Sequence, residues 1–194
     1  MIFSLFRRKA LDPVEFLYPK IVQKARQPGF YLDCAVPDTV EGRFEMILLH
    51  LAVVFQRFRS GDEAEKAVAQ KVVEAFFNDM DRSLREMGIG DISVPKKMKK
   101  LGQAYNGRLI AYHRAIDARD ADDFARIIIR NVMARDEGGE TETERTGAAA
   151  IADYAMATVD RLADVSIRDL VDDDIPVAVI PGVAFLSSSA GVYS

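Results

Sequence analysis

The stretch that decides the fold is residues 94–116, which read VPKKMKKLGQAYNGRLIAYHRAI. Its apolar residues recur at steps of four, three, four, four, three and four, and they are Val94, Met98, Leu101, Tyr105, Leu109, Tyr112 and Ile116. This spacing returns a side chain to the same face of an α-helix at every turn. It predicts a long amphipathic helix with one buried face.

A second helical pattern, before this one, is apolar almost all round. Between Phe44 and Phe58 the main apolar stripe is widened by Met46, Leu49, Val53 and Val54, so little of the circumference is polar. A helix of this kind has to be covered on every side. We therefore expect this helix to occupy the middle of a bundle.

Further helical patterns flank these two. They are predicted over residues 12–27, 62–87, 120–132 and 148–163, with a single turn at 167–171. Short polar residues precede several of them and are expected to act as N-caps, namely Asp12, Asp38 or Thr39, Asp62, Ser93 and Asp120. The predicted fold class is all-α, a single helical bundle of about six helices with an extended C-terminal tail.

The domain organisation follows from changes in composition. We expect a flexible N-terminal segment at 1–11, a helical domain at 12–174 containing a mobile acidic loop at 136–147, and an apolar tail rich in Pro, Gly and Ser at 175–194. The N-terminal segment has two interpretations. It is either a frayed end or a short amphipathic foot, with Phe3, Leu5 and Phe6 in lipid and the basic residues 7–9 at the phosphates.

Composition excludes several classes of function. The 194 residues carry a net charge of -4, so no global attraction to nucleic acid or anionic lipid is expected. The apolar run Met46–Phe55 is shorter than the roughly 20 residues that cross a bilayer, so no membrane span is expected. The single cysteine, Cys34, excludes an internal disulfide and is interpreted as a buried apolar residue.

No recognisable catalytic motif occurs, and no enzyme activity, metal or cofactor is expected. The only histidines are His50 and His113, outside any HExxH pattern, and His50 is interpreted as a hydrogen-bonded core residue. Asp79 and Asp81 point about 200° apart on a helix, so they are expected to form ion pairs with nearby arginines rather than to share one cation.

The sharpest local charge is the lysine cluster, which we define as Lys96, Lys97, Lys99 and Lys100. It lies at a helix N-terminus, where the helix macrodipole disfavours cations. Two readings stay open at this point. The cluster either binds phosphate or an acidic protein surface, or it is a solvated face that keeps the protein in solution.

Two stretches resemble the ubiquinol–cytochrome c chaperone family over Val36 to about Ala134. One is PDTVEGRFE at residues 37–45, leading into LLHL at 48–51. The other is FNDMD at 77–81, continuing through LREMGIGDISVPKKMKKL at 84–101 to Tyr105, Gly107, Arg108 and Tyr112. The resemblance implies an assembly chaperone of ubiquinol–cytochrome c reductase (respiratory complex III) whose client is newly synthesised cytochrome b.

The resemblance also implies partners and a location. The expected partners are nascent cytochrome b, the ribosome and a small partner subunit, with transient contact at a membrane surface and no direct binding of nucleic acid. The expected location is the cytoplasm, peripheral to the inner membrane. The client-binding hypothesis names Arg82, Arg85, Met87, Ile89, Ile92, Lys96, Lys97, Met98, Lys99, Lys100 and Arg108.

Two alternatives compete with this interpretation. The first is a ribosome- or nucleic-acid-binding module that uses Lys96–Lys100, and it predicts affinity that falls steeply with salt. The second is a metal-dependent enzyme acting on isoprenoids, which needs two Asp-rich motifs facing one cavity. A further hypothesis is that Ile175–Leu186 covers the client groove, so that its deletion would expose apolar surface.

Overall fold

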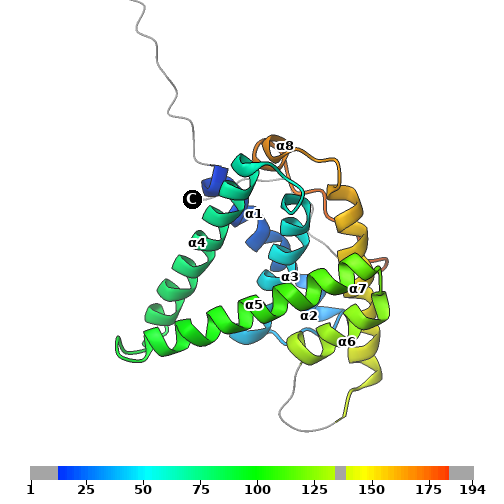
Figure 1. Ribbon diagram of the computed structural model, residues 1–194. Helices are drawn as coiled ribbons and strands as arrows, with labels where there is room; N and C mark the ends of the chain where they lie inside the picture. The colour runs from blue at the N-terminus through cyan, green and yellow to red at the C-terminus, as the bar shows by residue number, and fades with distance from the viewer. Residues whose placement is uncertain (1–12, 134–138, 184–194) are drawn as a thin grey trace, which may run out of the picture.

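The computed structural model describes residues 13–133 and 139–183. These ranges contain eight α-helices and no strand, and they are α1 (Pro13–Ala25), α2 (Pro28–Leu32), α3 (Val40–Phe58), α4 (Glu63–Glu86), α5 (Val94–Ala118), α6 (Ala121–Val132), α7 (Glu142–Leu162) and α8 (Ile167–Asp172). Six of the helices are long, and α2 and α8 are one or two turns each. The predicted all-α bundle of about six helices is confirmed (Figure 1).

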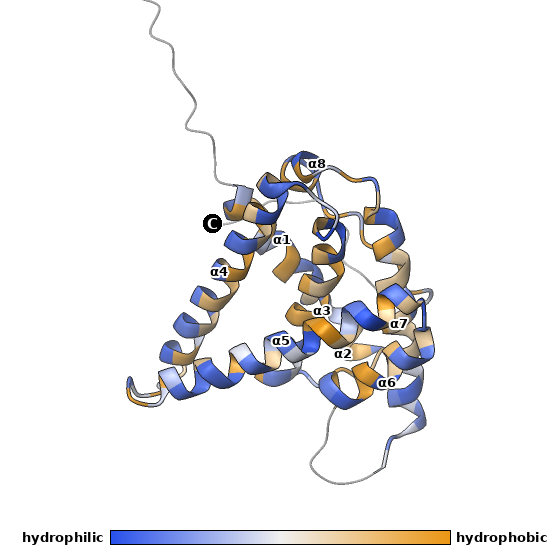
Figure 2. Cartoon of the chain, viewed as in Figure 1, coloured by the Kyte–Doolittle hydropathy of each residue, from blue (hydrophilic) through white to orange (hydrophobic). Residues whose placement is uncertain are grey.

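The predicted central helix is α3. Every residue from Glu45 to Phe55 is buried, and the helix contacts α1, α4, α5, α6 and α7. Figure 2 shows it as mostly hydrophobic, whereas α4 and α5 alternate between hydrophobic and hydrophilic residues along their length. The burial of α3 on all sides confirms the position that its sequence predicts.

Most of the expected helix starts are confirmed. The side chains of Thr39, Asp62 and Asp120 accept hydrogen bonds from backbone N–H groups in the first turns of α3, α4 and α6 at 3.1, 2.8 and 2.8 Å. The expected cap at Ser93 is wrong. Ser93 is itself in helical conformation and makes no capping bond, and Pro95 occupies the first turn of α5, where its missing N–H costs nothing.

Helix α7 begins earlier than composition suggests. The loop expected at 136–147 extends at most to Thr141, because residues 142–147 are helical, while 136–138 lie outside the described residues. A capping box starts the helix: Glu144 N donates to Thr141 Oγ1 at 3.2 Å, and Thr141 N donates to Glu144 Oε2 at 2.8 Å. A second difference is the short helix α2 at Pro28–Leu32, which lies between two predicted helices and was not among the predicted ones.

Helices α4 and α5 form an arm that leaves the rest of the bundle. The two helices meet at the loop 87–93 and diverge from it. The far end of α4 lies near α1, and the far end of α5 lies near α6 and α7 (Figure 1). We call the loop and the adjoining turns, residues 82–100, the arm tip. The arm places a short segment of the chain far from the main core.

Beyond α8 the chain is extended. We call residues 173–183 the C-terminal strap. Ile175, Ala178 and Ile180 are buried in the main hydrophobic core, whereas Val179 points outward. The expected extended tail is thus seen as far as residue 183, and residues 184–194 and 1–12 lie outside the described residues.

Candidate functional site

The arm tip is built on a glycine turn. Ile89 N donates to Leu84 O at 3.2 Å and Gly88 N to Arg85 O at 2.9 Å, while Gly88 adopts a φ of +78°. This is the hydrogen-bond pattern of a Schellman motif, in which a glycine reverses the chain at a helix end. It ends α4 at the place that the sequence predicts.

Two large apolar side chains at the tip face solvent. Ile92 is 97% exposed and Met87 is 53% exposed, while Ile89 and Met98 are half-buried. Exposed side chains of this size on both sides of one loop are candidates for contact with another molecule.

The lysine cluster is fully available. Lys96, Lys97, Lys99 and Lys100 are all exposed, and none forms an ion pair with another residue in 13–133 or 139–183. At 100° per residue, Lys96, Lys99 and Lys100 share one face of the first turns of α5. Their positive charges add to the positive end of the α5 dipole, so the tip attracts anionic groups.

The tip arginines, in contrast, are already paired. Arg82 binds Asp79 at 2.6 Å, and Arg85 binds Asp81 at 2.6 Å and also Asp91. The predicted salt-bridged face at Asp79 and Asp81 is therefore confirmed. Because the arginine charges are balanced by carboxylates, the lysines dominate the local potential.

Arg108 is separated from the other predicted contact residues. It lies eight residues beyond Lys100, about 12 Å further along α5. Its guanidinium forms a two-pronged ion pair with the carboxylate of Glu45 on α3, with Nη2–Oε1 at 2.9 Å and Nε–Oε2 at 3.1 Å. Burial raises the pKa of the Glu45 carboxyl, and Arg108 offsets part of that shift.

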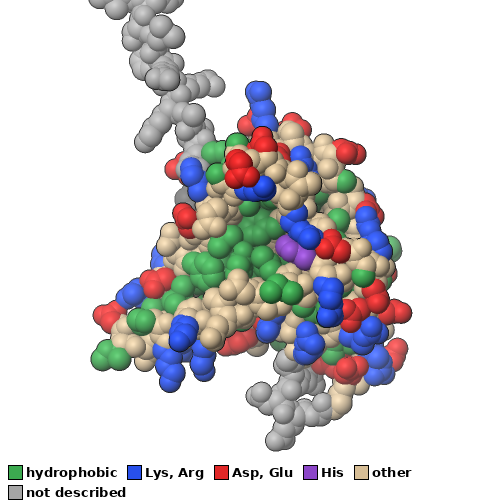
Figure 3. Space-filling model, viewed as in Figure 1, with side chains coloured by type: hydrophobic (Ala, Val, Ile, Leu, Met, Phe, Trp, Pro, Cys, Tyr) green, Lys and Arg blue, Asp and Glu red, His purple; other side chains and the backbone are tan. Residues whose placement is uncertain are grey.

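A hydrophobic hollow lies between the two helices of the arm. Figure 3 shows hydrophobic side chains gathered in a concavity bounded by α4 and α5. Both helices contribute half-buried apolar side chains that pack on the core, and they include Val68, Ala69, Val73, Phe77, Met80 and Leu109. The sequence led us to expect a client groove but not its place between α4 and α5, because the periodicity of each helix says nothing about the angle between them.

The histidines and the cysteine belong to the packing of the bundle. His50 is 3% exposed, with Nδ1 2.8 Å from Met46 O and Nε2 2.9 Å from the hydroxyl of Tyr154, and burial lowers its pKa to about 4. His113 Nε2 lies 2.9 Å from Ala52 O. Burial raises the pKa of the Cys34 thiol to about 11. The expectation of a hydrogen-bonded core histidine and a buried cysteine is confirmed.

Within 13–133 and 139–183, no group of three or more His, Cys, Asp or Glu side chains is arranged to hold a metal ion. No helix in these ranges is both long and apolar enough to cross a membrane. The exposed features are instead a cationic tip, two exposed apolar side chains and an apolar hollow. They lie on an all-α protein, and together they form its candidate contact surface.

The sequence places the chain in a known family. Residues 32–178 match the profile of the ubiquinol–cytochrome C chaperone family, and the chain belongs to that family. The match extends past the stretches that carry the resemblance in the sequence, since it includes α7, α8 and the first part of the C-terminal strap. The resemblance described in the sequence analysis covers only Val36 to about Ala134.

Known proteins agree with this assignment. The crystal structure of the Cbp3 homolog from Brucella abortus is similar, with a TM-score of 0.77 and 38% sequence identity, covering 95% of this chain and all of that one. Ubiquinol–cytochrome c reductase complex assembly factor 1 of Xenopus laevis is 21% identical over 104 residues, covering 54% of this chain and 52% of that protein. The mouse factor is 24% identical over 104 residues, or 35% of its length. This chain therefore matches about half or less of these curated relatives.

Proposed function

We propose that this chain is an assembly chaperone of ubiquinol–cytochrome c reductase that binds newly synthesised cytochrome b. Membership of the chaperone family carries the proposal, and the names of the curated relatives describe the same assembly process. The exposed lysines and apolar residues of the arm tip supply a surface for the client. We place the protein in the cytoplasm, in peripheral contact with the inner membrane where its client is inserted.

The arm offers two kinds of contact to such a client. A membrane protein subunit emerges as apolar helices joined by polar loops. The hollow between α4 and α5 accepts an apolar helix face (Figure 3), in the way amphipathic grooves bind helices. The lysine cluster binds acidic loop residues. No nucleotide is needed, because assembly of the client into the complex can displace the chaperone.

The residues of the predicted client-binding set differ in whether their side chains are free to contact a partner. The lysines, Met87 and Ile92 are free to contact a partner, and Ile89 and Met98 support them from half-buried positions. Arg82, Arg85 and Arg108 must exchange an existing ion pair for any new contact. We therefore expect the lysines to contribute more to client binding than the arginines.

The first test is capture of the client. A tagged chain is isolated from detergent-solubilised membranes of its native host, and the recovered proteins are read by mass spectrometry and by the haem b spectrum. Recovery of cytochrome b without the mature complex is expected. A small partner subunit or ribosomal proteins would be identified in the same experiment. Absence of cytochrome b from the captured material would remove the proposed client.

The second test locates the surface. Replacing all four residues of the lysine cluster by Gln is expected to reduce client capture at least fivefold. A matched control replaces four exposed arginines elsewhere by Gln, and these are Arg114, Arg126, Arg145 and Arg168. Both variants lose the same charge, so equal capture by the two would refute the assignment of the tip as client surface.

The alternative is binding to the ribosome or to nucleic acid through Lys96–Lys100. One observation favours it: the four lysines have no carboxylate partner among the described residues. Phosphate contacts release counterions, so binding would weaken steeply with salt, by about one counterion per contact. Capture of RNA that is lost at raised salt, with no cytochrome b recovered, would favour this alternative.

A further inference from the structure

The C-terminal strap lies in a groove between α1 and α7, and few of its own main-chain groups bond to each other. No residue in 13–133 or 139–183 pairs with it as a strand, and the hydrogen bond from Val177 N to Ile175 O at 2.8 Å is a local turn. Three apolar side chains, Ile175, Ala178 and Ile180, are 2%, 4% and 5% exposed. The groove is therefore filled by an extended peptide that happens to belong to the same chain.

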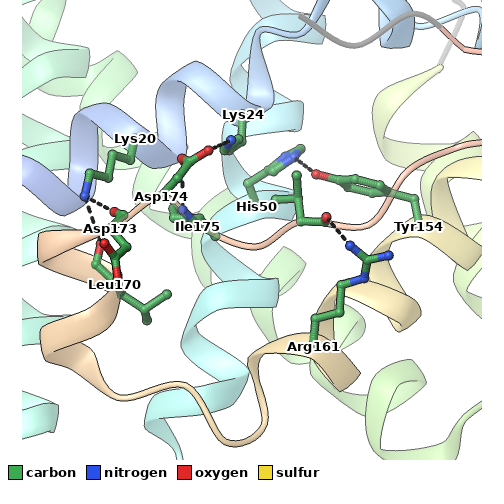
Figure 4. Close-up of polar contacts among 10 residues, drawn as sticks. Lys20, Lys24, His50, Tyr154, Arg161, Leu170, Asp173, Asp174 and Ile175 are labelled. Atoms are coloured by element: carbon green, nitrogen blue, oxygen red, sulfur yellow. Dashed lines mark hydrogen bonds and ion pairs between the residues drawn. The ribbon is translucent and has the colours of Figure 1, made fainter. Parts of the chain in front are cut away.

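The side chains that hold the strap contact mainly its backbone. On α7, Arg161 Nη1 donates to Val177 O at 2.9 Å, and Thr158 Oγ1 accepts from Ala178 N at 3.0 Å. On α1, Lys20 Nζ donates to the carbonyls at the end of α8 and the start of the strap, including Val171 O at 2.6 Å. Figure 4 shows Lys20 and Lys24 of α1 at one end of the segment and Arg161 of α7 at the other. Backbone contacts of this kind do not depend on the side chains of the bound peptide.

One contact does depend on a side chain of the strap. Lys24 is only 8% exposed and forms an ion pair with Asp174, the residue that precedes the buried Ile175. A buried ammonium without a carboxylate is strongly unfavourable. Any peptide that replaced the strap would have to bring an acidic residue to the same place.

From these contacts we infer that the α1–α7 groove is a peptide-binding site that the C-terminal strap occupies in cis. The partner that fits it is an extended segment of another polypeptide, with an acidic residue at its start and uncharged, apolar residues after it. The required spacing follows the strap: apolar residues one, four and six positions after the acid. Pro176 and Pro181 favour an extended cis segment, because each fixes its own φ angle and lacks an N–H donor.

The inference goes beyond the proposed function and does not depend on it. It concerns a face of the bundle formed by α1 and α7, whereas the arm tip is formed by α4 and α5. The experiment uses no cytochrome b, so its outcome is separate from that of the client-capture assay.

The test uses a fluorescent peptide of residues 173–183, DDIPVAVIPGV, added to the full chain. Ile175→Ser with Ile180→Ser weakens the cis strap and leaves the groove intact. The matched control is Val179→Ser, on the strap but 64% exposed. Fluorescence anisotropy is expected to give a dissociation constant at least tenfold lower for the double variant than for wild type or the control. A folded double variant that binds no more tightly than wild type would overturn the inference.

A second measurement uses wild type, so it tests the inference even if the double variant does not fold. An isotope-labelled peptide is added in excess to wild type, and amide hydrogen exchange of residues 175–180 is followed by mass spectrometry. Exchange in the strap is expected to accelerate at least threefold while α3 is unchanged, and unaltered exchange in the strap would contradict the site. A wild-type dimer that the peptide dissociates would assign the groove to the strap of a second copy and overturn the assignment to another polypeptide.

Discussion

At the scale of single residues, two glycines in helices differ in the space around them. A Cβ atom on Gly147, in α7, would lie 2.1 Å from the carbonyl oxygen of Cys34, which is backbone and cannot move aside cheaply. A Cβ on Gly107, in α5, would meet nothing within 4 Å. Gly147 therefore permits α7 to approach the segment between α2 and α3, whereas Gly107 has no such packing role.

The contrast predicts opposite effects of the same substitution. Gly147→Ala should lower the free energy of unfolding by about 1–3 kcal/mol, because the new methyl overpacks a rigid contact. Gly107→Ala should raise it by up to about 1 kcal/mol, because alanine favours the helix. Urea unfolding followed by circular dichroism measures both. Equal changes in the two variants would show that the close approach at Gly147 is unimportant.

At the scale of the elements, polar bonds fix how α5 lies against α3. Glu45 and Arg108 form the ion pair described above, and His113 and Asp117 on α5 bond to Ala52 O and to the side chain of Gln56 on α3. The Glu45 side chain is 10% exposed and that of Arg108 is 30% exposed. This ion pair between α3 and α5 is therefore largely shielded from solvent on the Glu45 side.

Removing Arg108 should show how much the ion pair with Glu45 contributes to the stability of the fold. Arg108→Met leaves the Glu45 carboxylate buried without a counter-charge, so we expect a loss of about 2–4 kcal/mol in the free energy of unfolding at pH 7. Without Arg108, burial raises the Glu45 pKa further. The loss should therefore shrink as the pH falls toward 5 and the carboxyl becomes neutral.

The comparison is made by urea unfolding of wild type and Arg108→Met at pH 7 and pH 5. The double variant Glu45→Gln with Arg108→Met serves as the control, because it has no carboxylate to titrate and should show little of this pH dependence. A loss in Arg108→Met that is the same at both pH values would contradict the electrostatic explanation.

Helices and most of their caps were predictable because they depend on neighbours in sequence. The stripe from Val94 to Ile116 and the caps at Thr39, Asp62 and Asp120 are examples. The start of α7 differs from the prediction because the acidic, Gly-rich residues around it are typical of a loop, although Thr141 and Glu144 have the spacing of a capping box. The angle of the arm, the Glu45–Arg108 pair and the course of the C-terminal strap depend on tertiary packing, so no local pattern reveals them.

At the scale of the whole molecule, the protein has two regions of unequal packing. The main core joins residues from α1 to α8 and the C-terminal strap in one cluster. Val94 is buried but lies outside that cluster, and the half-buried Leu84, Ile89, Met98 and Leu101 near it are also outside. The arm tip therefore relies on a small set of contacts of its own, and its local stability should be lower than that of the body.

Amide hydrogen exchange should separate the two regions. Protection in the middle of α3 and α7 is expected to equal the global free energy of unfolding, whereas residues 84–101 should exchange faster by local opening. Val94→Ala should speed exchange at the tip with little change in global stability. Ile151→Ala, in the main core and 0% exposed, should instead lower global stability by about 2–5 kcal/mol. If Val94→Ala destabilised the whole molecule as much as Ile151→Ala, the tip would be part of one cooperative unit, and the arm could not adjust to a client independently of the body.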